Sequence, residues 1–259
     1  KGGEDDIIVE NGSEIKLSID IKLQRYIEKL LEGKTGSVVA IDPSSGELLA
    51  IASAPSFDPN ILSGRDYSKN YRNLQLDTLK PIYNRALTAT YPPGSMFKLI
   101  QALIGLEENV VSKEDQIYVD LSRIGDLAPA GIYDLNKAIV NSSNNYFHML
   151  FRKLINQKRD NNTYIDSRIG LDRWSEYVKK FGLGSDLDFD ISNMSSGFVP
   201  SSEYYDGFYG KGRWKFSNIY SLSIGQGELL VTPIQMANFA SIIANRGYYY
   251  NPNIVTHIN

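Results

Sequence analysis

A serine and a lysine in this sequence, Ser95 and Lys98, have the spacing of a nucleophile and its base. They follow Tyr-Pro-Pro-Gly at residues 91–94, whose prolines and glycine would end any preceding helix, so Ser95 can open the next one. Three residues make about one helical turn, which would place the Lys98 amine on the face of Ser95. A serine becomes a good nucleophile when a neighbouring group takes its proton, and a lysine can do so once burial lowers its pKa. The pair therefore predicts a serine nucleophile activated by a lysine.

The same four-residue pattern occurs a second time, at Ser13 and Lys16. That copy lies in a polar, extended stretch, where side chains three positions apart point to opposite faces. Ser95 is instead followed by apolar residues that could bury Lys98, and a helix start offers backbone amides to developing negative charge. Taken alone, the Ser95 motif would also fit a helix cap followed by a solvated lysine.

A second constellation combines a hydroxyl and an amide, at Ser142 and Asn144. Together these groups can relay a proton and hold a peptide backbone. Such a triplet is also common in ordinary polar loops, and residues 68–70 show that the Ser-x-Asn spacing recurs by chance. The two constellations in one chain are stronger evidence than either of them alone.

The elements that would position these motifs begin with a helix and a hairpin. Apolar residues in residues 20–33 share one helical face, with Asp20 as the N-cap and Gly33 as the C-terminal stop. Two apolar runs, 37–41 and 47–52, are separated by turn-forming residues and predict a β-hairpin. The runs show little polar alternation, so both faces of the hairpin should be covered.

The rest of the chain is predicted to be mainly helical. We expect the Tyr-rich segment 204–214 to be a packed surface loop and a strand to begin within residues 248–255. Thr232, before a proline, is the expected N-cap of the last helix. The predicted helices span residues 97–108, 135–155, 171–181 and 233–245.

The composition argues against several classes of function. The 27 basic and 30 acidic residues give a net charge of -3 without long basic blocks, so we expect no nucleic-acid partner. Cysteine is absent and the only histidines are His148 and His257, so we expect neither a disulfide nor a catalytic metal. No run of about eighteen apolar residues and no signal peptide occurs within these residues.

Six segments, in family order and across nearly the whole chain, resemble the transpeptidase domain of class B penicillin-binding proteins, most closely the cell-elongation type, penicillin-binding protein 2. They are IDIKLQ (19–24), VAIDP (39–43), YPPGSMFK (91–98), SSNNYF (142–147), SIGQG (223–227) and TPIQMA (232–237). The resemblance implies that Ser95 is the acylated serine and Lys98 its base. It also implies that Ser142 is a catalytic residue and Asn144 a substrate-binding residue, with no metal or organic cofactor.

The family fold is a mixed α/β arrangement, in which an antiparallel sheet with flanking helices lies beside a mainly helical subdomain and the site lies between them. By resemblance, residues 17–259 form the transpeptidase domain, with a helix and hairpin at 20–54, a helical region at 55–247 and the start of a strand at 248–259. Residues 1–16 are the expected connector from a preceding domain.

The implied activity is D,D-transpeptidation of peptidoglycan stem peptides through a Ser95 acyl-enzyme, which β-lactam antibiotics block covalently. The resemblance also implies a membrane glycan polymerase as partner, and a location at the periplasmic face of the bacterial inner membrane through an N-terminal helix outside this chain. Two alternatives stay open: a relative that hydrolyses or senses β-lactams, and a catalytically silent cell-wall scaffold.

The sequence departs from the family pattern in two places. The family's third motif, Lys-Thr-Gly, is expected several tens of residues after the 232–247 helix, so we expect the gene to continue beyond Asn259 and a protein ending there to acylate poorly. The triplet Lys34-Thr35-Gly36 precedes the hairpin, where the family has no catalytic element, and Lys34 should lie away from Ser95. The segment between Asp115 and Asp134 is also shorter than in family members.

Overall fold

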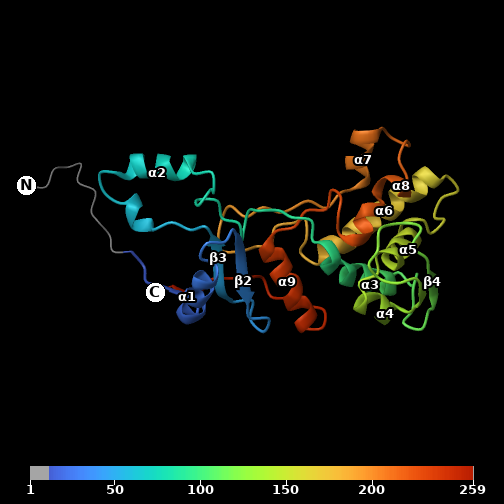
Figure 1. Ribbon diagram of the computed structural model, residues 1–259, viewed down its shortest axis with the longest axis horizontal. Coiled ribbons are helices and arrows are strands. Elements are labelled where there is room, and N and C mark those ends of the chain that lie inside the picture. Colours follow the sequence, from blue (N-terminus) through green and yellow to red (C-terminus); the bar gives the residue numbers. More distant parts are fainter. Residues whose placement is uncertain (1–11, 259) are drawn as a thin grey trace, which may run out of the picture.

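In the computed structural model, which describes residues 12–258, an antiparallel hairpin lies at the centre of one lobe (Figure 1). Val39 lies opposite Ile51 in its register. Helix α1 packs on the face that carries Ala50 and Ala52, while α9 packs against β2 and places Ile234 on the other face. Both faces are covered, as the apolar runs predict. The elements of this lobe are α1 (Ile21–Leu30), β2 (Gly36–Ile41), β3 (Leu48–Ala54) and α9 (Pro233–Ala244).

The two helices of this lobe begin at the predicted caps. The Asp20 carboxylate accepts hydrogen bonds from the backbone of Lys22 and Leu23, at 2.8 and 3.1 Å. Thr232 and Gln235 form a reciprocal capping box at the start of α9. These local contacts explain why the boundaries could be read from the sequence.

The second lobe is a bundle of helices around an aromatic core, on the right of Figure 1. Helix α3 lies at its centre, where the buried Gln101 amide accepts a hydrogen bond from Trp174 Nε1 at 2.8 Å and donates one to Leu222 O at 3.2 Å. The elements of this lobe are η2 (Gly94–Phe97), α3 (Lys98–Glu107), β4 (Ile117–Val119), β5 (Gly131–Tyr133), α4 (Leu135–Val140), α5 (Asn144–Ile155), α6 (Thr163–Lys180), α7 (Ser202–Tyr209), α8 (Phe216–Ile219) and η3 (Tyr220–Ile224).

An arm and a pair of end strands complete the described chain. The arm consists of η1 (Pro59–Leu62) and α2 (Tyr67–Leu76); it extends away from both lobes in Figure 1, and α2 has no buried residue. Strand β1 (Ile15–Leu17) pairs antiparallel with β6 (Val255–Ile258). Of the predicted connector, residues 1–11 lie outside the described part of the chain.

The predicted loop at 204–214 is wrong, because its first half is helix α7. The Asp172 carboxylate fixes the start of this helix by accepting hydrogen bonds from the Ser202 backbone and hydroxyl, at 2.8 and 2.6 Å. One turn apart, Tyr205 is fully buried and stacks on Tyr209 at 6.2 Å. Tyr205 is therefore a helical core residue, whereas Tyr204 and Phe208 of the same helix are exposed.

The helix predicted at 171–181 begins earlier, at Thr163, with Asn162 as its N-cap. Gly170 interrupts the helical pattern in the sequence, but it has a packing role. A Cβ on Gly170 would lie 2.7 Å from Ile155 Cα, so only glycine lets α6 cross the end of α5 this closely.

The expected strand near the C-terminal end begins at Val255, the last position of the predicted range. Backbone groups just before it are used elsewhere: Asn253 N donates to Gly46 O at 3.0 Å. The Asp190 carboxylate accepts hydrogen bonds from Ile254 N and Val255 N. The Asn253 contact holds the segment against the hairpin turn, and the Asp190 contacts hold it against a separate loop, without a strand ladder.

Candidate active site

Lys98 joins the two sequence constellations. Its side chain, only 2% exposed, points from the first turn of α3 to the break between α4 and α5. Its Nζ donates to Ser142 O at 2.5 Å, Ser142 Oγ at 3.0 Å and Asn144 Oδ1 at 2.6 Å. Three predicted site residues, 44 and 46 positions apart in sequence, therefore form one hydrogen-bonded cluster.

The pKa of the Lys98 amine is lower than that of an exposed lysine. Burial lowers the pKa of Lys98 from 10.5 to about 8, and the negative charge of Asp126 opposes this shift. The ring of Phe147, whose centroid is 5.8 Å from Nζ, forms part of the apolar surroundings. An appreciable fraction of Lys98 is neutral at mildly basic pH, as a base requires.

Ser95 lies in the 3-10 turn η2, directly before α3, and its side chain is exposed. The backbone N–H of Lys98 donates to Ser95 O, so the two residues sit on one turn. No hydrogen bond joins the Ser95 hydroxyl to another of the described residues; the Lys98 amine bonds to the Ser142 and Asn144 side instead. Ser95 is thus accessible to solvent one turn before Lys98.

The predicted helix at 135–155 is broken at Ser142, and this break creates the second half of the site. Ser142 has φ +50°, a left-handed conformation that is costly for a residue with a side chain. Ser143 then caps α5 by accepting from Tyr146 N at 3.3 Å. The sharp turn directs the Ser142 carbonyl and hydroxyl, together with the Asn144 amide, at Lys98.

Asp126 organises the loop beside this break and was not found by sequence reasoning. Its carboxylate accepts hydrogen bonds from Ser143 Oγ at 3.0 Å, Asn145 N at 2.8 Å and Ala128 N at 3.0 Å. Burial acts to raise the pKa of Asp126, but these hydrogen bonds outweigh it and lower the pKa. No residue pattern links Asp126 to a serine 17 positions away, so only the folded loop reveals it.

The Ser223–Gly227 segment supports the turn that carries Ser95. Gly94 N donates to Gly225 O at 2.8 Å, and Gly225 has φ +68°. A Cβ on Gly225 would lie 2.7 Å from Phe97 Cβ and would also collide with the Gly94 backbone. Glycine is required here for both backbone conformation and space.

We expect Gly225→Ala to destabilise the protein by about 2 kcal/mol, because it adds a left-handed alanine and a clash. This should lower Tm by roughly 5 °C and, by displacing the Ser95 turn, slow β-lactam acylation by about tenfold or more. The control is Gly33→Ala, since Gly33 has φ +69° and nothing within 4 Å of an added Cβ. Equal effects of the two substitutions on acylation would contradict the supporting role of Gly225.

The competing sequence patterns lie away from this cluster. Lys34, of the triplet at 34–36, follows α1 in the hairpin lobe, where its Nζ donates to Leu30 O. Ser13 is exposed and precedes β1. Figure 1 places α1 and α3 in different lobes. Among the described residues no group of three or more His, Cys, Asp or Glu is placed to hold a metal ion.

Comparison with known proteins identifies the family. The penicillin binding protein transpeptidase domain matches residues 36–259 of the chain. The chain belongs to the penicillin-binding protein transpeptidase family. The peptidoglycan D,D-transpeptidase MrdA of Haemophilus influenzae is 33% identical over 257 residues, which cover 95% of this chain and 37% of that protein. The chain spans about a third of the length of the curated relatives it matches.

Solved structures give the same transpeptidase fold. Pseudomonas aeruginosa PBP2, in complex with WCK 5153, superposes with a TM-score of 0.80 at 34% identity, covering 95% of this chain and 53% of that one. Helicobacter pylori PBP2, in complex with MreC, also gives 0.80, at 26% identity, covering 94% and 44%. The mixed α/β fold expected from the sequence is confirmed. None of the helices in the described part of the chain is long and apolar enough to cross a membrane.

Proposed function

We propose that this chain carries the D,D-transpeptidase site of a peptidoglycan cross-linking enzyme of the cell-elongation type, with residues 17–259 as its transpeptidase domain. The observation that carries the proposal is the buried Lys98, bonded to Ser142 and Asn144 one helical turn after an exposed Ser95. The family membership and the MrdA relatives support the same reaction class.

In the proposed first step, neutral Lys98 takes the Ser95 proton while Ser95 Oγ attacks the carbonyl of the penultimate D-alanine. The carbon–nitrogen bond to the terminal D-alanine breaks, and an ester to Ser95 remains. The leaving amine needs a proton, which Lys98 passes on through Ser142, whose hydroxyl lies 3.0 Å from Nζ. Asn144, fixed by its bonds to Lys98 and to Gly125 O at 2.7 Å, holds the substrate backbone.

In the second step, an amine of another stem peptide attacks the ester carbonyl and restores the Ser95 hydroxyl. Lys98, neutral again after the first step, accepts a proton from this amine and delivers it to Ser95 Oγ as the ester carbon–oxygen bond breaks. The same arrangement accounts for inhibition by β-lactams. The lactam carbonyl acylates Ser95, but the nitrogen released when the ring opens stays covalently attached to the acyl group and cannot leave the site. Each proton transfer in these two steps is assigned to a residue of this chain, Lys98 or Ser142.

The wider setting follows from the relatives. Helicobacter pylori PBP2 was solved in complex with MreC, and another neighbour belongs to a peptidoglycan synthase complex that coordinates polymerisation and crosslinking. These relatives support the proposal that this domain works at the periplasmic face of the inner membrane, next to a membrane glycan polymerase, with residues 1–16 as the connector to its anchor.

Turnover of a β-lactam separates this function from its alternatives. A transpeptidase should form one covalent adduct per chain with a fluorescent penicillin and hydrolyse nitrocefin only slowly after acylation, as intact-mass spectrometry and absorbance would record for the full-length protein. Rapid nitrocefin turnover would instead identify a β-lactam-hydrolysing relative. Absence of any adduct would identify a silent scaffold, so either outcome rejects the proposal.

A further inference from the structure

A basic groove lies on the outer face of α5, away from Lys98. It has a volume of about 710 Å³. We define the α5 groove by the four cationic side chains that line it: Arg123, Arg152, Lys153 and Lys158. They come from three segments, namely the loop beside the active site, the last turn of α5 and the loop that follows it.

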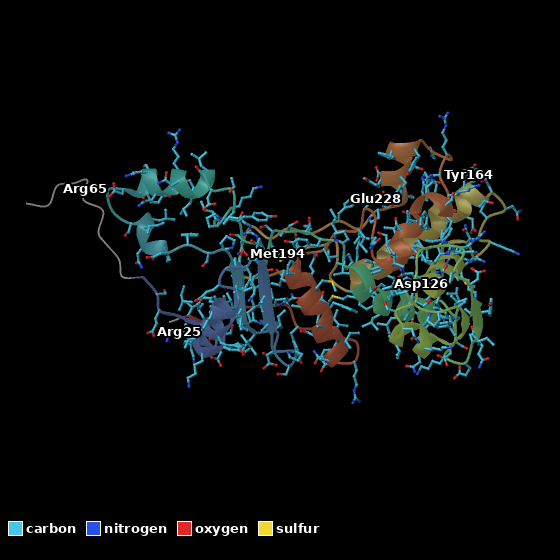
Figure 2. All side chains as sticks on the ribbon, in the orientation of Figure 1. Arg25, Arg65, Asp126, Tyr164, Met194 and Glu228 are labelled. Atoms are coloured by element: carbon cyan, nitrogen blue, oxygen red, sulfur yellow. The ribbon has the colours of Figure 1, made fainter. Side chains whose placement is uncertain are left out.

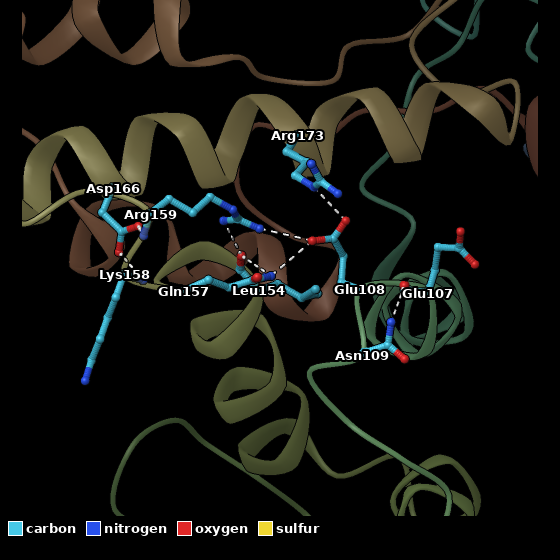
Figure 3. Close-up of polar contacts among 9 residues, drawn as sticks. All are labelled: Glu107, Glu108, Asn109, Leu154, Gln157, Lys158, Arg159, Asp166 and Arg173. Atoms are coloured by element: carbon cyan, nitrogen blue, oxygen red, sulfur yellow. Dashed lines mark hydrogen bonds and ion pairs between the residues drawn. The ribbon is translucent and has the colours of Figure 1, made fainter.

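None of the four cations of the α5 groove forms a direct ion pair with another described residue, although Lys153 and Arg123 interact electrostatically with Asp115 and Asp120. The ion pairs of the described residues use Arg159, Arg168 and Arg173. Figure 3 shows the contrast in one loop: the Arg159 guanidinium turns to Glu108 at 3.1 Å, whereas the Lys158 side chain extends away from Glu108. The charge of Lys158 is therefore available to a ligand.

The two acids that line the α5 groove are already used by the backbone. Asp166, 4% exposed, accepts hydrogen bonds from Arg159 N at 2.8 Å and Lys158 N at 3.3 Å (Figure 3). Asp160 accepts one from Asn162 N at 2.7 Å. These hydrogen bonds fix the conformation of the loop that lines the groove. The carboxylates of Asp160 and Asp166 therefore bond to the backbone rather than pair with the cations of the α5 groove.

The α5 helix dipole explains only part of this charge. Cations in the last turn of a helix are favoured, which would account for Arg152 and Lys153. It does not account for Arg123 and Lys158, which lie on other segments. Arg152 is also held in place, with Cζ 5.7 Å from the centre of the Phe216 ring.

One loop connects the α5 groove to the active site. Arg123 N and Ile124 N donate to Asn145 Oδ1, at 3.3 and 3.2 Å. Asn144, the residue before Asn145, donates a hydrogen bond from Nδ2 to Gly125 O. Arg152 is eight residues along α5 from Asn144, about 12 Å at 1.5 Å per residue, which is the reach of about four extended peptide residues.

We propose that the α5 groove binds carboxylate groups of the peptidoglycan whose stem peptide reacts at Ser95, an inference that rests on the proposed function. Stem peptides combine scattered carboxylates with many amides, and the groove combines separated cations with neutral hydrogen-bonding groups such as Asn156 and Thr163.

The test is sedimentation of the full-length protein with purified peptidoglycan sacculi. The triple variant Arg152→Gln, Lys153→Gln, Lys158→Gln should bind about tenfold more weakly at low salt, with the difference shrinking as salt rises. The matched control is Lys22→Gln, Arg25→Gln, Lys29→Gln, which removes the same charge from the exposed face of α1 in the other lobe and should bind within about twofold of the unsubstituted protein. Figure 2 labels Arg25 there.

Sacculi whose carboxylates are amidated should abolish the difference between the variant and the unsubstituted protein. The proposal would be overturned if a triple variant of unchanged Tm bound untreated sacculi as tightly as the unsubstituted protein does. It would also be overturned if the triple variant still bound amidated sacculi more weakly than the unsubstituted protein. If the triple variant lost binding only to phosphatidylglycerol vesicles and not to sacculi, the groove would be assigned to lipid phosphate instead. If the triple variant unfolds, Lys158→Gln alone replaces it, with an expected loss of about twofold.

Acylation of the unsubstituted protein by a fluorescent penicillin separates the two proposals. A protein that forms no adduct refutes the proposed function whatever its affinity for sacculi. A protein that is acylated, but whose groove variant binds sacculi normally, refutes only the inference about the α5 groove.

Discussion

Ser95→Ala should abolish covalent labelling of the full-length protein by a fluorescent penicillin, because it removes the only oxygen that can form the ester. We expect the rate of adduct formation to fall by roughly a thousandfold or more, to the background of the assay. Ser95 is exposed and its hydroxyl has no hydrogen-bond partner among the described residues, so alanine should leave Tm within about 1 °C. Gel fluorescence and thermal melting measure the two quantities.

The matched control is Ser13→Ala, in the second copy of the Ser-x-x-Lys pattern. Ser13 is exposed in the other lobe, and its partner Lys16 lies in strand β1 rather than on a helical turn. Labelling should be unchanged in this variant. Mass spectrometry of the acylated peptide decides the assignment, since an adduct on any serine other than Ser95 would show that the nucleophile is misplaced.

The parts of the fold that sequence reasoning predicted correctly are those fixed by local contacts. The Asp20 and Thr232 caps bond to backbone groups two or three residues away, so the signal and the structure lie in the same few positions. The hairpin likewise follows from two apolar runs and their turn. The fold class needed the resemblance as well, because a hairpin and several helices fit many architectures.

The parts that sequence reasoning missed depend on contacts between distant segments. Asp126 holds the start of α5 across 17 residues, and the start of α7 depends on Asp172, 30 residues before Ser202. Gly170 lowers the apparent helical tendency of its segment although tertiary packing demands it. The residues of the candidate site were named from motifs, but the motif could not show that Lys98 bonds to Ser142 and Asn144 at the same time.

Lys98→Arg should slow acylation of Ser95 by roughly a hundredfold to ten thousandfold, even though it keeps the positive charge. A guanidinium stays protonated at any working pH and cannot accept the serine proton. The matched control is Lys137→Arg on α4, because Lys137 is exposed and outside the site cluster. Its acylation rate, measured by stopped-flow fluorescence, should equal that of the unsubstituted protein.

The pH dependence of acylation tests the same role without a substitution. Because burial lowers the pKa of Lys98 to about 8, the fraction of neutral amine rises as pH increases through that value. The acylation rate of the unsubstituted protein should therefore climb between about pH 7 and pH 9 and then level off. In Lys98→Arg this rise should disappear, whereas a merely structural lysine would leave the profile unchanged in both proteins.

Should Lys98→Arg unfold because the longer side chain crowds the Ser142 turn, Lys98→Gln removes the base with less volume. A Lys98→Gln protein of normal Tm that still acylates with the rise near pH 8 would assign the base to another group.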